Sequence, residues 1–181
     1  MNCLSILLPG LLSFIYCSIG TKKMLADKSK STVTYTMVHP MHKWDGVSSD
    51  VSAALLYEEL TKQVQSVAVL IRVATFNSQN QNRDSHMVEV LEGLKYPTVS
   101  FTSQDVKHNA DGTLTANGKL TFHNVTRPMS IQVNHHEAAS QLIVNGTFNV
   151  KLSDYAIDPP SLLGISTKDQ FTITFVLAFT K

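Results

Sequence analysis

The second half of the chain alternates apolar and polar residues with a period of two, and this pattern limits the fold more than any other feature. Successive side chains of a β-strand point to opposite faces, so such a run gives a strand one apolar and one polar face. The longest runs cover residues 142–152 and 171–179. Shorter ones cover residues 67–73, 114–122 and 129–133. We therefore expect an all-β fold.

The length of these runs favours a closed sheet. A strand of about ten residues spans roughly 33 Å, and strands with one polar face are typical of antiparallel sheets with one face in water. Long open edges promote aggregation, and closure into a barrel removes them. A two-sheet sandwich is the alternative, and the strand length favours the barrel. The sequences at 109–112 (NADG) and at Asn145-Gly146 are typical of turns or bends between or within strands.

The first twenty residues contain no charged side chain and are mostly apolar. Such a segment is typical of a secretory signal, and Ser18 and Gly20 place small residues before a cleavage ahead of Thr21. We therefore predict a signal peptide over residues 1–20, a periplasmic or otherwise exported protein, and one domain over residues 27–181. The alternative is an uncleaved anchor or a misassigned start. Both cysteines, Cys3 and Cys17, fall inside this segment, so the predicted mature chain has neither disulfides nor thiolate sites.

Charge argues against a nucleic-acid partner. The chain of 181 residues has a formal net charge of +1, and its longest basic run is Lys22-Lys23. A nucleic-acid-binding surface needs a concentrated face of Lys and Arg to neutralise phosphates. The same distribution is unlike that of a polybasic membrane-surface protein.

One segment departs from the β pattern. A polar stretch rich in Asn and Gln runs from Phe76 into Arg83, and Asp84 or Ser85 is a candidate cap for a helix that follows. Helical spacing of i, i+3, i+4 and i+7 then places four apolar side chains on one face: Met87, Val90, Leu91 and Leu94. Pro97 prevents the helix from continuing. We predict a helix of about three turns that covers an end or a flank of the barrel.

Three blocks in order resemble the YceI-like family of lipid-binding proteins. The first is FNSQNQNRDSHMVEVLEGLKYPTVSFTSQDV, the second is GKLTFHNVTRPMSIQV, and the third is GTFNVKLSDYAID. The resemblance covers about residues 31–181. The chain departs from the family pattern in the segment TYTMVHPMHKWDGVSSDV, which contains His39, His42 and Trp44. Residues 50–62 have strong helix propensity. The resemblance implies a strand over residues 51–57 instead, and we follow it there because tertiary context often overrides propensity.

The resemblance implies an extended antiparallel barrel of lipocalin type, with about eight strands and one short helix. It also implies non-catalytic binding or transport of a lipophilic isoprenoid-type molecule, a polyprenyl lipid or a quinone, in an apolar cavity. No cofactor is expected, and a homodimer is left open. From the facing of the rows, the candidate cavity residues are Met87, Leu91, Phe101, Leu120, Phe122, Ile131, Val144, Phe148, Ile173, Phe175 and Leu177.

Two other functions stay open at this point. Periodicity alone does not distinguish a hollow barrel from a solid-cored interaction module. A histidine-dependent enzyme would use His39, His42 and His86. Against a metal site, positions 39 and 42 point to opposite faces of a continuous strand, and zinc needs further ligands. Against a triad, Asp84, Ser85 and His86 are helix neighbours, whose side chains fan out by about 100° each. We expect Arg83 and Asp84 to tie the loop to the barrel end instead.

Overall fold

The computed structural model describes residues 20–138, 140–162 and 164–181, so the predicted signal peptide lies almost wholly outside the described residues. It is mostly β-structure, with one α-helix, α1 (Gln81–Val90), and three short 3₁₀ helices, η1 (Lys28–Lys30), η2 (Val73–Thr75) and η3 (Ser153–Tyr155). The strands, in chain order, are β1 (Thr21–Leu25), β2 (Thr32–His39), β3 (His42–Ser48), β4 (Val51–Glu58), β5 (Gln63–Arg72), β6 (Thr98–His108), β7 (Leu114–Phe122), β8 (Val125–Ala138), β9 (Gln141–Lys151), β10 (Ser161–Leu162), β11 (Ile165–Ser166) and β12 (Gln170–Thr180).

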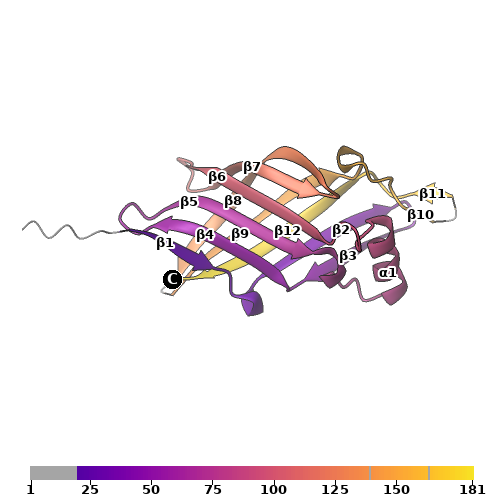
Figure 1. Cartoon of the computed structure of the whole chain (residues 1–181), viewed down its shortest axis with the longest axis horizontal. Coiled ribbons are helices and arrows are strands. Elements are labelled where there is room, and N and C mark those ends of the chain that lie inside the picture. Colours follow the sequence, from indigo (N-terminus) through magenta and orange to yellow (C-terminus); the bar gives the residue numbers. More distant parts are fainter. Residues whose placement is uncertain (1–19, 139, 163) are drawn as a thin grey trace, which may run out of the picture.

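Ten of these strands form one antiparallel sheet, in the order β1-β4-β5-β6-β7-β8-β9-β12-β2-β3. The sheet curls into an elongated barrel, which confirms the expected all-β, lipocalin-like fold (Figure 1). The strand count is ten rather than eight, because β1 adds a strand beside β4 and the β2–β3 hairpin extends the other edge. Strand β1 also lies ahead of the predicted domain start at residue 27.

The two edges of the sheet meet through short contacts. Near one edge, Ala26 bridges Phe179 of β12, and at the other, Val47 of β3 bridges Asn77. A fully buried serine lies near each junction. The hydroxyl of Ser31 accepts a hydrogen bond from the Ala178 backbone N–H at 3.1 Å. The hydroxyl of Ser48 lies 2.7 Å from that of Thr75. Each serine therefore satisfies polar groups that closure of the barrel removes from water.

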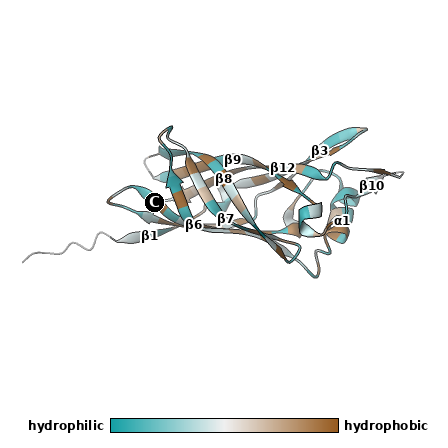
Figure 2. Cartoon of the chain, turned by 90° about the horizontal axis from the view of Figure 1, so that it is seen from above, coloured by the Kyte–Doolittle hydropathy of each residue, from teal (hydrophilic) through white to brown (hydrophobic). Residues whose placement is uncertain are grey.

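The two ends of the barrel differ (Figure 1). At the helix end, α1, the β2–β3 turn and the β10–β11 hairpin gather together. The β4–β5 turn and the C-terminus lie at the far end. Along the strands, hydrophilic and hydrophobic residues alternate, as the period-two pattern predicts (Figure 2). Strand β4 is a clear case, because Val51, Ala53, Leu55 and Tyr57 are buried while the residues between them are not. This confirms the strand that the resemblance implied there, and helix propensity was the wrong guide.

Strands β8 and β9 pair over only part of their length. Among the described residues, their last pair toward the helix end is Val133 with Gly146, although both strands continue beyond it. The remaining halves stay paired on their other sides, β8 with β7 and β9 with β12. Arg127 crosses the unpaired part, because its Nε donates to the backbone oxygen of Asp154 at 2.9 Å. Gly146 lies inside β9, as the alternating run over residues 142–152 predicted.

The helix begins earlier than predicted. Its N-cap is Asn80, whose side chain accepts a hydrogen bond from the backbone N–H of Arg83 at 3.1 Å, so neither Asp84 nor Ser85 is the cap. It ends at Val90, and Glu92 has a φ of +43°, which turns the chain away from helical geometry. Leu94 therefore does not continue the apolar face, and its side chain is 98% exposed. Within the part of the chain that the structure describes, no helix is long and apolar enough to span a membrane.

Candidate functional site

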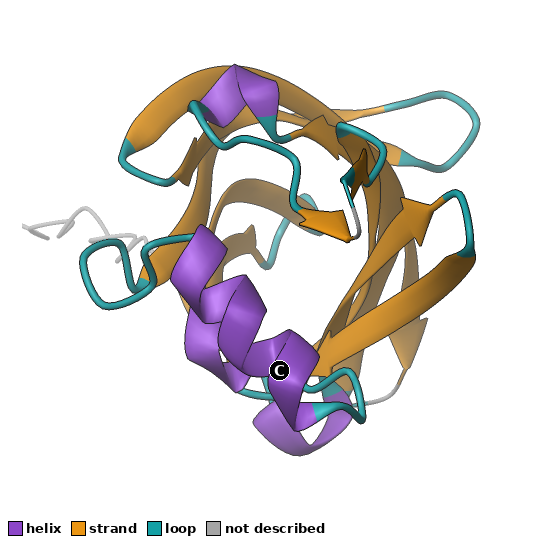
Figure 3. Ribbon diagram, turned by 90° about the vertical axis from the view of Figure 1, so that its right-hand side faces the viewer, coloured by secondary structure: helices purple, strands orange, loops and turns teal. Residues whose placement is uncertain are grey.

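The barrel encloses a cavity of about 550 Å³, a size typical of small-molecule sites. It is lined by inward-facing strand residues and, at one end, by residues of α1. Figure 3 shows the strands curled into a ring, with α1 at the end that faces the viewer. A solid-cored barrel has no such space. All eleven predicted cavity residues line it: Met87, Leu91, Phe101, Leu120, Phe122, Ile131, Val144, Phe148, Ile173, Phe175 and Leu177. Their contact with a ligand remains a prediction.

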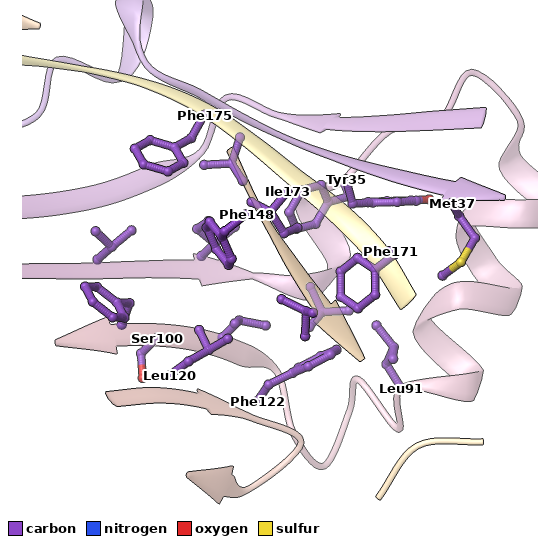
Figure 4. Close-up of a pocket in the computed structure, with 18 of the residues that line it drawn as sticks. Tyr35, Met37, Leu91, Ser100, Leu120, Phe122, Phe148, Phe171, Ile173 and Phe175 are labelled. Atoms are coloured by element: carbon purple, nitrogen blue, oxygen red, sulfur yellow. The ribbon is translucent and has the colours of Figure 1, made fainter. Parts of the chain in front are cut away.

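Aromatic rings shape the middle of the cavity (Figure 4). The rings of Phe148 and Phe175 meet edge to face with centroids 6.2 Å apart. Phe122 contacts Phe171 at 6.4 Å and Tyr155 at 5.5 Å. Edge-to-face contacts of this kind stabilise aromatic clusters beyond their buried area. They fix the cavity walls without polar groups, so the interior can hold an apolar chain.

Glycines make room for two of these rings rather than for a ligand. A Cβ at Gly146 would lie 2.9 Å from the ring of Phe175. A Cβ at Gly118 would lie 2.7 Å from the ring of Phe101 and 2.3 Å from the backbone oxygen of Thr102. At both positions a ring from the neighbouring strand fills the space beside the glycine.

The far end of the cavity is closed. Met24, Leu142 and Phe179 are each 1% exposed there and form an apolar plug. Outside this plug the hydroxyl of Tyr57 donates to Glu137 at 2.9 Å, and the ammonium of Lys181 donates to the same carboxylate at 2.8 Å. Burial and the adjacent Glu137 raise the pKa of Tyr57 to about 12, so it stays a donor at neutral pH. Hydrogen bonds from Lys181 and Tyr57 lower the pKa of Glu137.

The helix end carries most of the polar lining. His39, His42, Trp44, Arg83 and His86 all border the cavity here. The cavity is therefore amphipathic along its length, with an apolar interior and a polar mouth. Such an arrangement suits a molecule with a long apolar tail and a more polar head.

His39 and His42 do not point to opposite faces as predicted. Strand β2 ends at His39, the chain turns through Pro40 and Met41, and His42 pairs directly across from His39. Their rings lie 5.2 Å apart, and His42 in turn stacks on Trp44 at 5.0 Å. The prediction assumed one continuous strand, whereas a hairpin reverses the direction. His39 is buried, and its Nε2 lies 3.0 Å from the backbone oxygen of Ile165. Across the described ranges, no cluster of three or more His, Cys, Asp or Glu residues could hold a metal ion.

Arg83 and Asp84 hold the loop before α1 in place, as we expected. The guanidinium of Arg83 donates to the hydroxyl of Ser78 at 2.8 Å and to its backbone oxygen at 2.7 Å. The carboxylate of Asp84 accepts a hydrogen bond from the backbone N–H of Ser78 at 3.0 Å. Arg83 also lies 5.2 Å over the ring of Trp44 on β3, a cation–π contact. These contacts fix α1 against the barrel mouth.

The residues of the apparent triad do not converge. Asp84 is bonded to Ser78, whereas His86 lies 3.4 Å from Glu89, one turn further along the helix. Both partners are local, so the arrangement provides no nucleophile activated by a base. Met87 and Leu91 face the cavity from the same helix.

Several cavity residues were missed by sequence reasoning. Strand β2 supplies Val33, Tyr35 and Met37 to the cavity wall. Their signal was present in the sequence, because residues 32–37 (TVTYTM) alternate strictly. Burial raises the pKa of Tyr35, so its phenol remains neutral beside the apolar lining. Trp44 and Arg83 could not have been found in this way, since their places depend on how α1 packs on β3.

Known proteins are similar to this chain in sequence and in fold. The sequence model of the YceI-like domain matches residues 25–179. A UPF0312 protein of Pseudomonas savastanoi pv. phaseolicola is 27% identical over 143 residues, which cover 74% of this chain and 71% of the relative.

Two solved structures show the same fold. Burkholderia cenocepacia BcnA has a TM-score of 0.76 at 18% identity and covers 84% of this chain and 98% of its own. A polyisoprenoid binding domain from Saccharophagus degradans, implicated in plant cell wall breakdown, has a TM-score of 0.69 at 14% identity. That match covers 89% of this chain and 99% of the other.

Proposed function

Because this chain belongs to the YceI-like domain family, we propose that it binds a lipophilic molecule with an isoprenoid-type chain inside its barrel. The observation that carries the proposal is the cavity of about 550 Å³ with its apolar walls and one polar mouth. The polyisoprenoid binding domain of Saccharophagus degradans, which shares the fold, supports the ligand class. The tail lies along the aromatic rows, and the head lies at the helix end near Trp44 and Arg83.

The mechanism is sequestration. Each methylene removed from water contributes roughly 0.8 kcal/mol, so about ten buried carbons contribute roughly 8 kcal/mol before the cost of ordering the chain. Binding therefore needs no strong polar contact. The polar mouth orients the molecule, because a charged or hydroxylated head that entered the apolar interior would lose its hydrogen bonds to water.

We also propose that the molecule is held and released unchanged, as a polyprenyl lipid or a quinone. Asp84 pairs with Ser78, and His86 pairs with Glu89. Because these two side chains do not act together, the arrangement supports a role without catalysis. Export is a further proposal, which rests on the apolar opening sequence. Cell fractionation combined with N-terminal mass determination of the native protein tests it.

Mass spectrometry of an organic extract from the purified full-length protein tests the binding proposal. We expect a lipid of the isoprenoid class in near one-to-one ratio with protein, and a thermal shift when geranylgeraniol is added to delipidated protein. A clean extract together with no thermal shift would contradict the proposal. Recovery of a chemically altered isoprenoid after incubation, lost in His39→Ala or His42→Ala, would favour the enzyme instead.

A further inference from the structure

Two hairpins project from the helix end of the barrel and lie against each other. One is the tip of the β2–β3 hairpin, residues 39–43, and the other consists of β10 and β11 with residues 164–168; we call them the paired hairpins. His39 Nε2 lies 3.0 Å from the backbone oxygen of Ile165, and the backbone N–H of Lys168 donates to the backbone oxygen of Val38 at 2.9 Å. Figures 1 and 2 show β10 and β3 at this same end.

The paired hairpins expose apolar side chains at their tips. Met41 is 66% exposed and Ile165 is 45% exposed. Neither lines the cavity, although His39, His42 and Thr167 beside them do. An exposed methionine and isoleucine on adjoining projecting turns are poorly placed for water and well placed for insertion into an apolar phase.

The two tip segments themselves carry only positive charge. Lys43 and Lys168 are exposed, and residues 39–43 and 164–168 contain no carboxylate. The next carboxylates along the chain lie outside the tips: Asp45 accepts from Thr36, Asp169 accepts from Ser153 at 2.6 Å, and exposed Asp158 precedes β10. On the opposite side of the mouth, exposed Glu89 and Glu92 lie beside His86 and Lys95, so that side carries both signs of charge. An anionic surface would therefore attract the two lysine-bearing tips.

We propose that the paired hairpins dock the barrel onto an anionic lipid bilayer, with Met41 and Ile165 inserted among the acyl chains and Lys43 and Lys168 on the headgroups. This inference rests on the proposed function, since it supplies the route by which a membrane lipid reaches the cavity. The mouth opens beside the hairpins, so a docked barrel receives a lipid tail without exposing it fully to water. Attachment by only two apolar side chains and two lysines is reversible, which suits a carrier that must leave again.

Trp44 provides a local probe, because it is the single tryptophan of the chain, directly follows Lys43 of the β2–β3 tip and lines the cavity at its mouth. The probe surface is vesicles of phosphatidylglycerol and phosphatidylcholine with brominated acyl chains, added to the full-length protein. We expect quenching of Trp44 fluorescence that weakens as salt rises, because screening removes the attraction of the lysines. Vesicles of phosphatidylcholine alone should quench less.

The decisive variants compare the two ends of the barrel. Met41→Ser with Ile165→Ser should reduce the vesicle partition constant about tenfold or more, since both inserted side chains are lost. Lys43→Gln with Lys168→Gln should reduce it about tenfold on the anionic vesicles and have little effect on the neutral ones. Leu56→Ser with Leu60→Ser removes side chains that are 40% and 70% exposed near the far end, and should leave partitioning unchanged.

Equal quenching of Trp44 in the hairpin variants and the wild-type protein would overturn the inference. The same follows if the far-end variant loses as much vesicle partitioning as the hairpin variants do. A dimer in vesicle-free solution that Met41→Ser with Ile165→Ser dissociates would identify the surface as a contact between two copies and also overturn it. Geranylgeraniol binding in solution separates the two ideas. If hairpin variants keep that binding but lose vesicle partitioning, docking stands. If wild-type protein lacks that binding, the proposed ligand class fails independently of the quenching result.

Discussion

Gly146 on β9 pairs with Phe175 on β12, and the ring of Phe175 lies over the glycine so closely that a Cβ there would be 2.9 Å from it. A backbone oxygen, that of Gln132, lies 3.2 Å from the same point on the other side. The glycine therefore fixes where the ring lies, and the ring forms part of the cavity wall.

Gly146→Ala should push the ring of Phe175 toward the cavity and weaken ligand binding. Overpacking of this kind costs about 1–3 kcal/mol of folding free energy. Thermal unfolding and geranylgeraniol titration measure the two effects. Gly112→Ala is the matched control: it has a φ of +81° and no atom within 4 Å. That change costs about 1 kcal/mol through backbone strain but should leave binding unchanged. Unaltered binding in Gly146→Ala would show that the ring has space to move outward.

Leu120→Trp should block the cavity. Leu120 is buried on β7 and lines the cavity, whereas its neighbour Lys119 is exposed on the outer face. A larger ring on the inward face fills the space that the tail needs, so lipid recovered by extraction should fall severalfold. Lys119→Trp introduces the same side chain on the outside and should retain wild-type lipid content. Equal lipid in both variants would mean that the tail lies elsewhere.

Glu137 links Tyr57 and Lys181 at the far end, and its pKa is lower in the folded protein than its usual value of 4.5. This carboxylate therefore contributes stability that is fully present above pH 4.5 and is lost as pH falls through the lowered pKa. Glu137→Gln should lower the free energy of unfolding at pH 7 and flatten its dependence on pH below 4.5. Denaturant unfolding at a series of pH values measures this, with exposed Glu59→Gln as the control. An unchanged slope would contradict the assignment.

Tyr57 gives the opposite behaviour at high pH. Its folded pKa of about 12 lies above the usual value of 10. The stabilisation is therefore present below pH 10 and is lost as pH rises toward 12. Tyr57→Phe should remove that loss and cost about 1 kcal/mol at pH 7 through the missing hydrogen bond. Spectrophotometric titration of the tyrosines should show one phenol fewer in the late-ionising group of the variant.

Arg83→Ala should loosen α1 from the mouth. It removes both bonds to Ser78 and the contact with Trp44, at a cost of about 1–3 kcal/mol. Arg83→Lys keeps the charge but not the planar fork, so it should restore only part of the loss. Trp44 fluorescence and hydrogen exchange of α1 measure the change, with exposed Gln81→Ala as the control. Full recovery in the lysine variant would mean that charge alone holds the helix.

Patterns within single strands were predictable from the sequence. The rows ending at Phe122 and Phe179 lie on the inner faces of β7 and β12 as expected, because burial of one face requires that period. The alternation breaks near the end of β12, where Ala178 is buried as well. Most of the cavity wall follows directly from this alternation. In strand β4 the burial pattern competes with helix propensity. Taken by themselves its residues favour a helix, but the barrel buries every second side chain, and the segment forms a strand.

Features that depend on chain reversal or on distant packing were not predictable. His39 and His42 face one another because a hairpin turns between them, which spacing alone does not show. Asn80 is the N-cap, whereas the carboxylate of Asp84 accepts a hydrogen bond from Ser78 instead. That contact forms only after the loop folds. Gly146 was correctly placed in a strand, but its role in accommodating a ring depends on the neighbouring strand β12.

The incomplete pairing of β8 and β9 has a mechanical consequence. From Gly146 toward the helix end, the described residues form no ladder between these two strands, so widening that half of the tube ruptures no backbone hydrogen bond between them. Resistance to expansion there comes from side chains such as Arg127, which reaches across to Asp154. We therefore expect the barrel to widen more easily near its mouth than at its closed end. A thick or branched tail then fits near the mouth without breaking backbone hydrogen bonds between β8 and β9.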